Sequence, residues 1–446
     1  MDGKVVVAGG GPAGTVAAIA AARGGARTIL VERGEAIGGV ATSGGLSVWG
    51  PFDDGDRLLD WDRDARIEAG LPLSPEMAVG NRVIKGIPQE ILDRLLKMGG
   101  AIDYTYGFIP VNPECLKLVL EEMVLQAGGE IMYGAQVHGV SMQGDRVAAA
   151  LVANKRGSQE IGGAVFVDAT GDADLAAFAG APFEKGRKSD GQMQGVTMVF
   201  KLGGCDFTGR FYQSREDIKK ADLEFKTAFE RGEATRQYSV GCINRIPGME
   251  GCVAVNTQHC FNVDATDPAS LGAAMTRGRR ECHEIAGLFK RHLRGFERCY
   301  LLETAPFIGI RETRRVVGDY VITKADILLA RQFEDSVGRN AYNLDIHIPG
   351  EAENAAGEIF LKPGASYTMP YRALLPLGTS NLIVAGRSVS STHEAQSSLR
   401  IMPCCMVMGQ AAGTAAALAA NGKGGALREV DVKTLQAQLA KDNVVL

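Results

Sequence analysis

The segment from Lys4 to Glu32 constrains the fold more than any other, because a glycine-rich turn joins a short apolar strand to an alanine-rich helix there. Lys4 to Ala8 is a β-branched run typical of a buried strand. Pro12 to Arg23 is rich in alanine and predicts a helix, and Thr28 to Val31 predicts a second strand. Strand, helix and strand in this order predict a βαβ unit whose two strands are parallel.

The turn itself reads Gly9-Gly10-Gly11-Pro12-Ala13-Gly14 and matches GxGxxG. In such a turn Gly9 permits the tight bend, Gly11 lets the backbone approach a pyrophosphate, and Gly14 allows close packing of helix and strand. The helix N-terminus offers N–H groups and the positive end of its dipole to phosphates. Glu32 ends the second strand, where an acid hydrogen-bonds a ribose. A glycine turn without a ligand is the alternative, but the full context predicts a dinucleotide site.

Composition narrows the class of protein. The net charge of -4 gives no electrostatic case for nucleic acid or an acidic membrane as partner. The nine cysteines lack the spacing of a metal site, an iron–sulfur cluster or a secreted disulfide framework. No apolar stretch is long enough to span a bilayer, and the N-terminus lacks a signal peptide. We therefore expect no metal and a cytoplasmic location.

A chain of 446 residues predicts more than one domain. We expect an α/β, Rossmann-like domain over 1–189 that resumes over 373–446, with a second domain inserted over 190–372. The change of pattern near residue 190 supports the insertion, and we expect it to be α+β with a mixed or antiparallel sheet. The main elements expected after the βαβ unit are helices over 86–98, 113–127, 216–231, 268–294 and 402–420, and strands over 130–133, 136–141, 147–154, 164–167, 192–202, 252–258 and 381–385.

Three further motifs carry a resemblance to a known family. The first is Gly38-Gly39-Val40-Ala41-Thr42, after Glu32-Arg33; the second is Asp168-Ala169-Thr170-Gly171-Asp172; the third is Ala385-Gly386-Arg387-Ser388, followed by Thr392-His393-Glu394-Ala395, Leu399-Arg400 and Gly409-Gln410-Ala411-Ala412-Gly413. With the glycine turn, they make nearly the whole chain resemble FAD-dependent oxidoreductases of the glutathione-reductase-like flavoprotein superfamily. Within it, the branch related to fumarate reductase and heterodisulfide reductase flavoproteins is the most similar.

The resemblance implies FAD as cofactor. No histidine stands near Gly39 to Gly45 to match the one that carries covalent FAD in some relatives, so we expect non-covalent FAD. The CxxxxC pair of thiol reductases and a second GxGxxG unit for NAD(P)H are absent from the sequence. The residues expected to contact FAD are Gly9, Gly11, Pro12, Ala13, Gly14, Glu32, Arg33, Gly39, Ala41, Thr42, Val137, Asp168, Gly171, Gly386, Arg387 and Met402.

Physical reasons support the later motifs. Gly171 would let the chain pass close to the cofactor, and Arg387 could hold a phosphate or ribityl oxygen. The helix that starts near Met402 would aim its N-terminus at the flavin. The four-residue spacing of Gly409 and Gly413 is more typical of helix packing. Cys404 and Cys405 are adjacent in an apolar helix, which favours buried packing over redox chemistry.

His393, Arg400 and Arg311 are the candidate catalytic residues. His393 could act as acid or base, and the two arginines could hold a substrate or stabilise an anion. The charge-dense segment 311–315 fits a surface salt-bridge network equally well. Asp345 and His347 share one face of a possible strand, and an exposed face is favoured over a pocket. The remaining histidines, His138, His259, His283 and His292, are read as structural.

The leading hypothesis is an enzyme that transfers a hydride between a small organic substrate and flavin N5, in either direction, with an external electron acceptor or donor. The pocket would lie between the two domains. A flavin monooxygenase is one alternative, but its late GDAAH-like turn is missing here. A flavin-bearing electron-transfer subunit of a larger complex is another. A homo-oligomer stays open.

Overall fold

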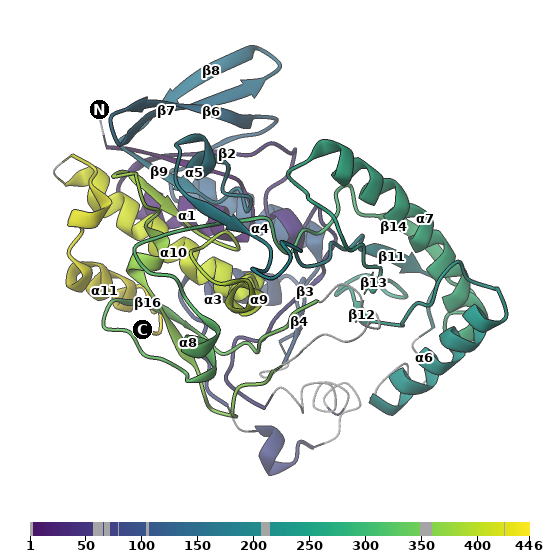
Figure 1. The fold of residues 1–446 in the computed structure, drawn as a ribbon. Coiled ribbons are helices and arrows are strands. Elements are labelled where there is room, and N and C mark those ends of the chain that lie inside the picture. Colours follow the sequence, from purple (N-terminus) through teal and green to yellow (C-terminus); the bar gives the residue numbers. More distant parts are fainter. Residues whose placement is uncertain are drawn as a thin grey trace.

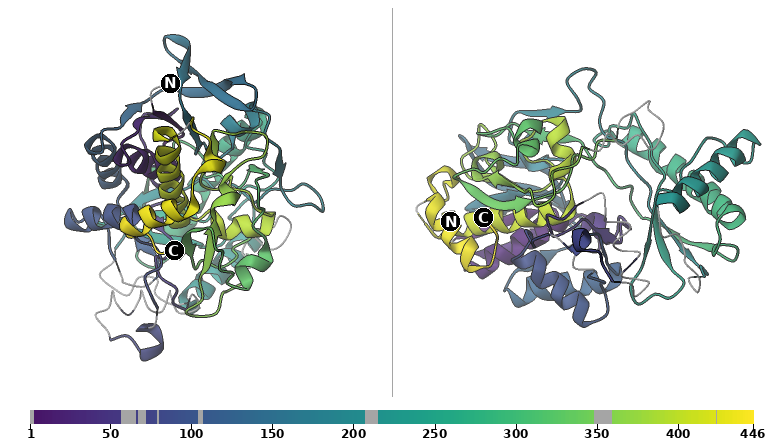
Figure 2. Two further views of the ribbon diagram at one scale, coloured as in Figure 1. Left: turned by 90° about the vertical axis from the view of Figure 1, so that its left-hand side faces the viewer. Right: turned by 90° about the horizontal axis from the view of Figure 1, so that it is seen from below.

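The computed structural model describes residues 3–446 apart from 57–65, 67–71, 79, 104–106, 207–214, 348–358 and 423. Two groups of elements make up the molecule (Figure 1). The larger group contains both ends of the chain. The smaller group, drawn in teal and green, lies to one side of it, and Figure 2 shows the same division from two further directions.

A parallel sheet of five strands forms the centre of the larger group, in the order β18-β9-β1-β2-β5. The predicted βαβ unit is confirmed, because β1 and β2 are parallel and α1 connects them. Three elements that come much later in the chain complete the sheet. The bounds are β1 Lys4–Ala8, α1 Pro12–Arg23, β2 Arg27–Val31, β5 Glu130–Met132, β9 Val165–Asp168 and β18 Leu382–Val384.

Alternate residues of the parallel strands enter two different apolar cores. Val5 and Val7 face α1, α3 (Ile87–Lys97), α4 (Pro113–Gln126) and α10 (Met402–Asn421). Val6 and Ala8 face the opposite side, where an antiparallel sheet of three strands and the short helix α5 (Asp174–Phe178) cover them. That sheet consists of β6 (Gln136–Gln143), β7 (Arg146–Asn154) and β8 (Gly157–Gly162). The result is a three-layer α/β fold.

The helices α1 and α10 pack so closely that side chains are excluded between them. A Cβ atom on Gly409 would lie 2.1 Å from the carbonyl oxygen of Ala13, and one on Gly413 would lie 2.2 Å from that of Ala17. The glycine spacing noted in the sequence therefore serves helix packing. Of the described helices, Met402–Asn421 is long and apolar enough to cross a membrane, but 94% of its most apolar window is buried inside the protein, as in a core helix.

The smaller group is built on a second sheet, which is antiparallel and has the order β12-β13-β11-β14. Phe200 and Val255 on one face pack against Phe225 and Phe289 of two long helices. Val199 and Ala254 lie on the opposite face. The strand predicted over 192–202 is shorter than expected, since residues before Phe200 pair only through isolated bridges. The elements are β11 Phe200–Gly203, α6 Arg215–Glu230, β12 Cys242–Arg245, β13 Val253–Asn256, α7 Pro268–His292 and β14 Tyr300–Thr304.

Short elements connect the two groups. The buried residues of the second core lie between Val196 and Ile308, whereas residues from Ile322 to Leu375 contribute to the first core. The limits 190–372 of an inserted domain stay a prediction. The connecting and peripheral elements are β3 Val48–Trp49, β4 Ile109–Pro110, β10 Phe183–Lys185, β15 Arg314–Val316, α8 Lys324–Leu328, β16 Ser336–Asn340, β17 Tyr367–Pro370, α9 His393–Leu399 and α11 Val432–Lys441.

Candidate functional site

A cavity of about 900 Å³ runs between the parallel sheet and the face of the antiparallel sheet that carries Val199. Its wall on one side consists of the segments that follow the carboxyl ends of β1, β2, β9 and β18. Ligands of open α/β sheets bind at this edge. The wall on the other side includes Asn244 and Asn256 from β12 and β13, and the segment from Pro306 to Arg311. Cofactor-type and substrate-type surfaces therefore face one cavity.

The glycine turn is held in shape by backbone contacts and leaves one side open. Gly9 has φ +92°, and a Cβ on it would lie 2.5 Å from the carbonyl oxygen of Ala169. A Cβ on Gly14 would lie 1.8 Å from the carbonyl oxygen of Gly9, so the turn closes only with glycine there. A Cβ on Gly11 would meet nothing within 4 Å, because Gly11 borders the cavity. The open side of the turn is the surface that a ligand would cover.

The start of α1 borders the same space. Gly11 is its N-cap and provides no side-chain cap, and Pro12 and Ala13 line the cavity. The first-turn N–H groups and the positive end of the helix dipole are thus directed to the cavity.

Glu32 lies beside the turn at the carboxyl end of β2. Its two carboxylate oxygens accept hydrogen bonds from the backbone N–H of Gly10 and of Gly34, each at 2.7 Å. Glu32, Arg33 and Val137 all line the cavity, as the sequence analysis expected. The carboxylate is fixed in place where a ribose hydroxyl would reach it.

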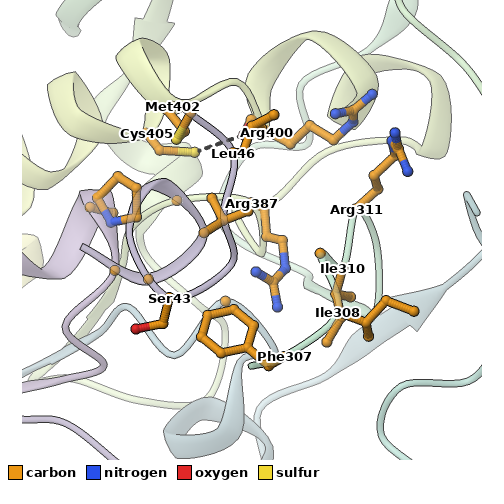
Figure 3. A pocket seen from close by; sticks show the side chains of 18 of the residues that line it. Ser43, Leu46, Phe307, Ile308, Ile310, Arg311, Arg387, Arg400, Met402 and Cys405 are labelled. Atoms are coloured by element: carbon orange, nitrogen blue, oxygen red, sulfur yellow. Dashed lines mark hydrogen bonds between the residues drawn. The ribbon is translucent and has the colours of Figure 1, made fainter. Parts of the chain in front are cut away.

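Arg387 enters the middle of the cavity from the end of β18 (Figure 3). Its Nη2 donates to Oδ1 of Asp172 at 2.7 Å, and its buried Nε has no partner in the described part of the chain. Burial raises the pKa of Asp172, but Arg387 and a hydrogen bond from Thr313 outweigh it and lower this pKa overall. Gly171 has φ +80°, and a Cβ there would lie 2.6 Å from the guanidinium of Arg387. Gly171 therefore makes room for Arg387.

Gly39, Gly386 and Met402 also line the cavity, so most of the predicted cofactor-contacting residues surround one space. Four predicted residues are not in the lining: Gly14, Ala41, Thr42 and Asp168. Asp168 is fully buried; it accepts hydrogen bonds from the backbone N–H of Thr170 and Ala176, and burial raises its pKa to about 6. Thr42 donates to the carbonyl oxygen of Ile37. Thr42 and Asp168 therefore stabilise the turns behind the lining.

The opposite end of the cavity carries two arginines, which we call the arginine end (Figure 3). Arg311 donates to the carbonyl oxygen of Gly195 at 2.7 Å and to Oγ1 of Thr197 at 2.6 Å. Arg400 donates to the backbone carbonyl and to Oδ2 of Asp345, both at 3.0 Å. Burial, reinforced by the positive charge of Arg400, lowers the pKa of Arg311 to about 9. A buried guanidinium with neutral partners is costly unless a ligand supplies negative charge.

Two histidines and an aspartate complete the arginine end. His259 and His347 stack with their ring centroids 4.9 Å apart, and Nε2 of His347 lies 3.4 Å from Oδ1 of Asp345. Burial raises the pKa of Asp345, but His347, Arg400 and Arg311 outweigh it and hold this pKa well below its usual range. Burial and the nearby Arg311 lower the pKa of His347 to about 4, so it is neutral at physiological pH. The same two causes hold the pKa of His259 well below its usual value.

His393, the predicted acid or base, does not line the cavity. It begins α9, and its Nδ1 lies 2.8 Å from Oε2 of the buried Glu312. Glu312 also contacts Arg315, whose side chain is 2% exposed. The charged segment after Arg311 is therefore a buried network rather than a solvated strand. In this network His393 joins α9 to the segment before β15.

Some residues of the arginine end were missed by the sequence analysis. His259 lines the cavity although it was read as structural, and Asp345 and His347 face inward rather than outward. The described residues of this segment form isolated bridges, such as the one from Leu344 to Ile359, and Asp345 is not part of a regular strand. Sequence spacing placed Asp345 and His347 on one face, but it gave no signal that His259 or the two arginines lie beside them, because these neighbours come from distant segments. Cys405 also borders the cavity, and burial raises the pKa of its thiol to about 12, which fits packing rather than redox chemistry.

The end of the cavity lined by Gly9, Gly11, Pro12, Ala13 and Glu32, which we call the glycine end, fits FAD by its chemistry together with Arg387 in the middle of the cavity. The open side of Gly11, the uncapped start of α1 and the unpartnered Nε of Arg387 suit a pyrophosphate, and Glu32 suits a ribose. The segment from Gly39 to Leu46 would border the flavin side, as the resemblance implies, and α10 begins there with no side-chain cap.

Comparison with known proteins agrees with this chemistry. The family model for FAD dependent oxidoreductases matches residues 4–439. No curated protein matches the chain.

Three solved structures illustrate the distant likenesses. A geranylgeranyl bacteriochlorophyll reductase-like protein of Thermoplasma acidophilum is 14% identical over 99% of this chain and 83% of that chain, with a TM-score of 0.44. The p-nitrophenol 4-monooxygenase of Pseudomonas putida is 12% identical over 98% and 83%, with a TM-score of 0.44. A myxobacterial FAD-dependent halogenase is 12% identical over 98% and 78%, with a TM-score of 0.45.

Proposed function

The chain belongs to the FAD-dependent oxidoreductase family and is an enzyme that uses FAD, and on this premise we propose that it transfers a hydride between a small organic anion and the cofactor. The observation that carries the proposal is the single cavity that joins the glycine turn to the arginine end. FAD supplies the two-electron chemistry when it is bound. The protein supplies the binding, the orientation and the exclusion of water.

The charge at the arginine end supports an anionic substrate. Arg311 and Arg400 contribute two positive charges, Asp345 contributes one negative charge, and both histidines are neutral. Among the described residues, Arg311 has hydrogen-bond partners that are all uncharged. A carboxylate or another oxyanion of the substrate would balance this excess, and a guanidinium binds such a group through two parallel hydrogen bonds.

Apolar side chains next to the arginines support a small organic molecule rather than a purely inorganic anion. Phe307, Ile308 and Ile310 extend along the wall that leads to Arg311 (Figure 3). Pockets for small molecules commonly combine such a wall with a few fixed polar groups. The hydrocarbon part of the substrate would lie against this wall while Arg311 and Arg400 hold its charged end.

The finer lineage is part of the proposal. We place the chain in the glutathione-reductase-like superfamily, in the branch related to fumarate reductase and heterodisulfide reductase flavoproteins, on the motifs at Gly9, Asp168 and Gly386. The segment from Gly39 to Gly50 contains neither histidine nor cysteine, which supports FAD held without a covalent bond. The antiparallel sheet and its two helices would act as the substrate domain.

Anaerobic titration tests this function. The purified protein with bound FAD is mixed with a panel of organic acids, each paired with its amide or ester, while the flavin absorbance is followed. We expect members of the acid series to bleach the flavin and their neutral counterparts to fail. Bleaching by neutral compounds alone would contradict the anionic substrate. Reduction that requires a partner protein would instead favour an electron-transfer subunit, and rapid NAD(P)H-dependent hydroxylation would favour a monooxygenase.

A further inference from the structure

We propose that His347, oriented by Asp345, exchanges a proton with the substrate during the reaction, and that the substrate therefore carries a hydroxyl group in its reduced form. This inference rests on the proposed function and adds a named proton acceptor to it. Three histidines lie in or beside the cavity and are candidates for the proton acceptor: His259, His347 and His393. Their contacts distinguish them.

His393 is excluded by its position. Its side chain is directed to Glu312, and it is not part of the cavity wall. A proton acceptor must come within hydrogen-bond reach of the group that loses the proton. His393 is within hydrogen-bond reach of Glu312, which belongs to the buried network with Arg315.

His259 is excluded by its hydrogen bonds. Its Nδ1 lies 2.7 Å from the carbonyl oxygen of Thr257, which can only accept, so Nδ1 carries the proton. Its Nε2 lies 3.1 Å from Nη2 of Arg311, which can only donate, so Nε2 is the acceptor. Both ring nitrogens are engaged and the tautomer is fixed. His259 is a positioning residue that holds Arg311.

His347 has the arrangement of a catalytic base. Nε2 lies 3.4 Å from Oδ1 of Asp345, while Nδ1 has no partner among the residues that the structure describes. Asp345 is itself held by Arg400, and the ring of His347 stacks on His259. The ring is thus stacked on one face and has one nitrogen beside a carboxylate, while no described residue contacts the other nitrogen, and Arg311 and Arg400 are close enough to influence the charge of the ring. A carboxylate that orients an imidazole in this way is a recurring catalytic device.

The chemistry balances for oxidation of a secondary alcohol. FAD, when bound, would be the two-electron oxidant that takes up the hydrogen and the electron pair lost by the carbon, and the hydroxyl would lose its proton to Nδ1 of His347. A carbon–oxygen double bond forms, and Asp345 stays ionised beside the imidazolium. An external acceptor later removes the two electrons. In the opposite direction, His347 gives the proton to the alkoxide as a carbonyl is reduced.

Binding of the anion would prepare His347 for this role. In the free protein its pKa is about 4, since burial and Arg311 disfavour the charged ring. A substrate carboxylate on Arg311 and Arg400 offsets their positive charge, so this pKa rises on binding. Among the described residues, the charged and titratable groups that face His347 are Asp345 on its own segment, Arg311, Arg400 and His259. Because His347 has a higher pKa in the anion-bound protein than in the free protein, binding of the anion is accompanied by proton uptake at pH values just above 4. This uptake disappears as the pH rises above the pKa of His347 in the bound state.

Oxalate is a suitable probe, because it carries carboxylates but has no hydrogen to lose as hydride. Isothermal titration calorimetry of the FAD-bound protein at about pH 5, in two buffers of different ionisation enthalpy, counts the protons taken up per oxalate. We expect uptake in the wild type and in His393→Gln, and none in His347→Gln or His347→Asn. Flavin absorbance and thermal unfolding report whether each variant keeps FAD and its fold.

The outcomes separate this inference from the proposed function. If oxalate does not bind the wild type, the anion site at the arginine end is wrong, and the inference fails with it. If oxalate binds but proton uptake is the same in both His347 variants, the proposed function stands and the role of His347 is wrong. With a substrate found in the titration, His347→Gln should slow flavin reduction by roughly 10²- to 10⁴-fold, and an unchanged rate would also contradict the role.

Discussion

The two ends of the cavity differ in whether backbone or side-chain atoms form their walls. At the glycine end the wall is mostly backbone: Gly9, Gly11 and the start of α1 come from one continuous segment, and atoms of the main chain fix their shape. At the arginine end the wall consists of charged side chains, and Arg311, Asp345 and Arg400 come from three separate segments. In our account the backbone at the first end binds the cofactor, while the side chains at the second end bind the substrate. Changes at the first end should therefore affect occupancy by FAD, and changes at the second should affect turnover.

Gly11→Val should have the largest effect. Its Cβ would meet nothing within 4 Å, so the fold should tolerate the side chain, but the valine would occupy the space beside the start of α1. We expect FAD affinity to fall by at least about 100-fold, which corresponds to roughly 2.7 kcal/mol. Flavin absorbance after purification and equilibrium dialysis measure it.

Gly272→Val is the matched control, because Gly272 in α7 also has open space around it and lies away from this cavity. Full FAD occupancy in Gly11→Val would remove the basis for assigning the cofactor to the glycine end.

Arg311→Met should lower activity on the substrate without lowering the affinity for FAD. The substitution leaves the glycine end intact, so FAD should stay bound, but a substrate anion would lose its buried partner. Loss of one member of a buried charge pair costs about 2–5 kcal/mol, so kcat/KM should fall at least about thirtyfold. Steady-state kinetics with an acid identified by titration measure this. Arg298→Met is the control, because the Arg298 side chain is 83% exposed. Loss of FAD together with activity would show that the two ends are not independent.

Gly413→Ala should affect stability and not chemistry. The added Cβ would lie 2.2 Å from the carbonyl oxygen of Ala17, so α1 and α10 must move apart. Overpacking of this kind costs roughly 1–3 kcal/mol and should lower the melting temperature by a few degrees. Differential scanning calorimetry of the FAD-bound protein measures the change. Gly272→Ala, in open space on α7, should be neutral or stabilising. Equal effects of the two changes would contradict the close packing of α1 and α10.

His393→Gln should have the smallest effect on turnover. The residue contacts Glu312 away from the cavity, so the rate of flavin reduction and the affinity for FAD should stay unchanged. The lost contact should lower stability by about 1 kcal/mol. Rapid-mixing measurements of flavin bleaching test this expectation. A large drop in the rate with normal FAD binding would return His393 to the catalytic role that the sequence suggested.

The difference between the two ends also explains what the sequence could reveal. The glycine turn, Glu32 and Arg387 were predictable because each belongs to a short motif whose chemistry is local. Arg311 and Arg400 stood out through their motif context and charge. His259 and His347 could not be placed, because tertiary contacts alone bring them together from opposite ends of the region 259–347. His393 was expected in the cavity since it follows Arg387 closely, but the start of α9 directs it to Glu312.

A crystal structure of the protein with FAD and oxalate tests the central claim most directly, because it locates both ligands at once. We predict the adenosine beside Glu32, the diphosphate at Gly11, and the flavin between the segment from Gly39 to Leu46 and the segment from Phe307 to Arg311. Oxalate should contact Arg311 and Arg400 in the same cavity. Oxalate bound elsewhere, or a flavin that points away from Arg311, would contradict the account of one cavity in which cofactor and substrate meet.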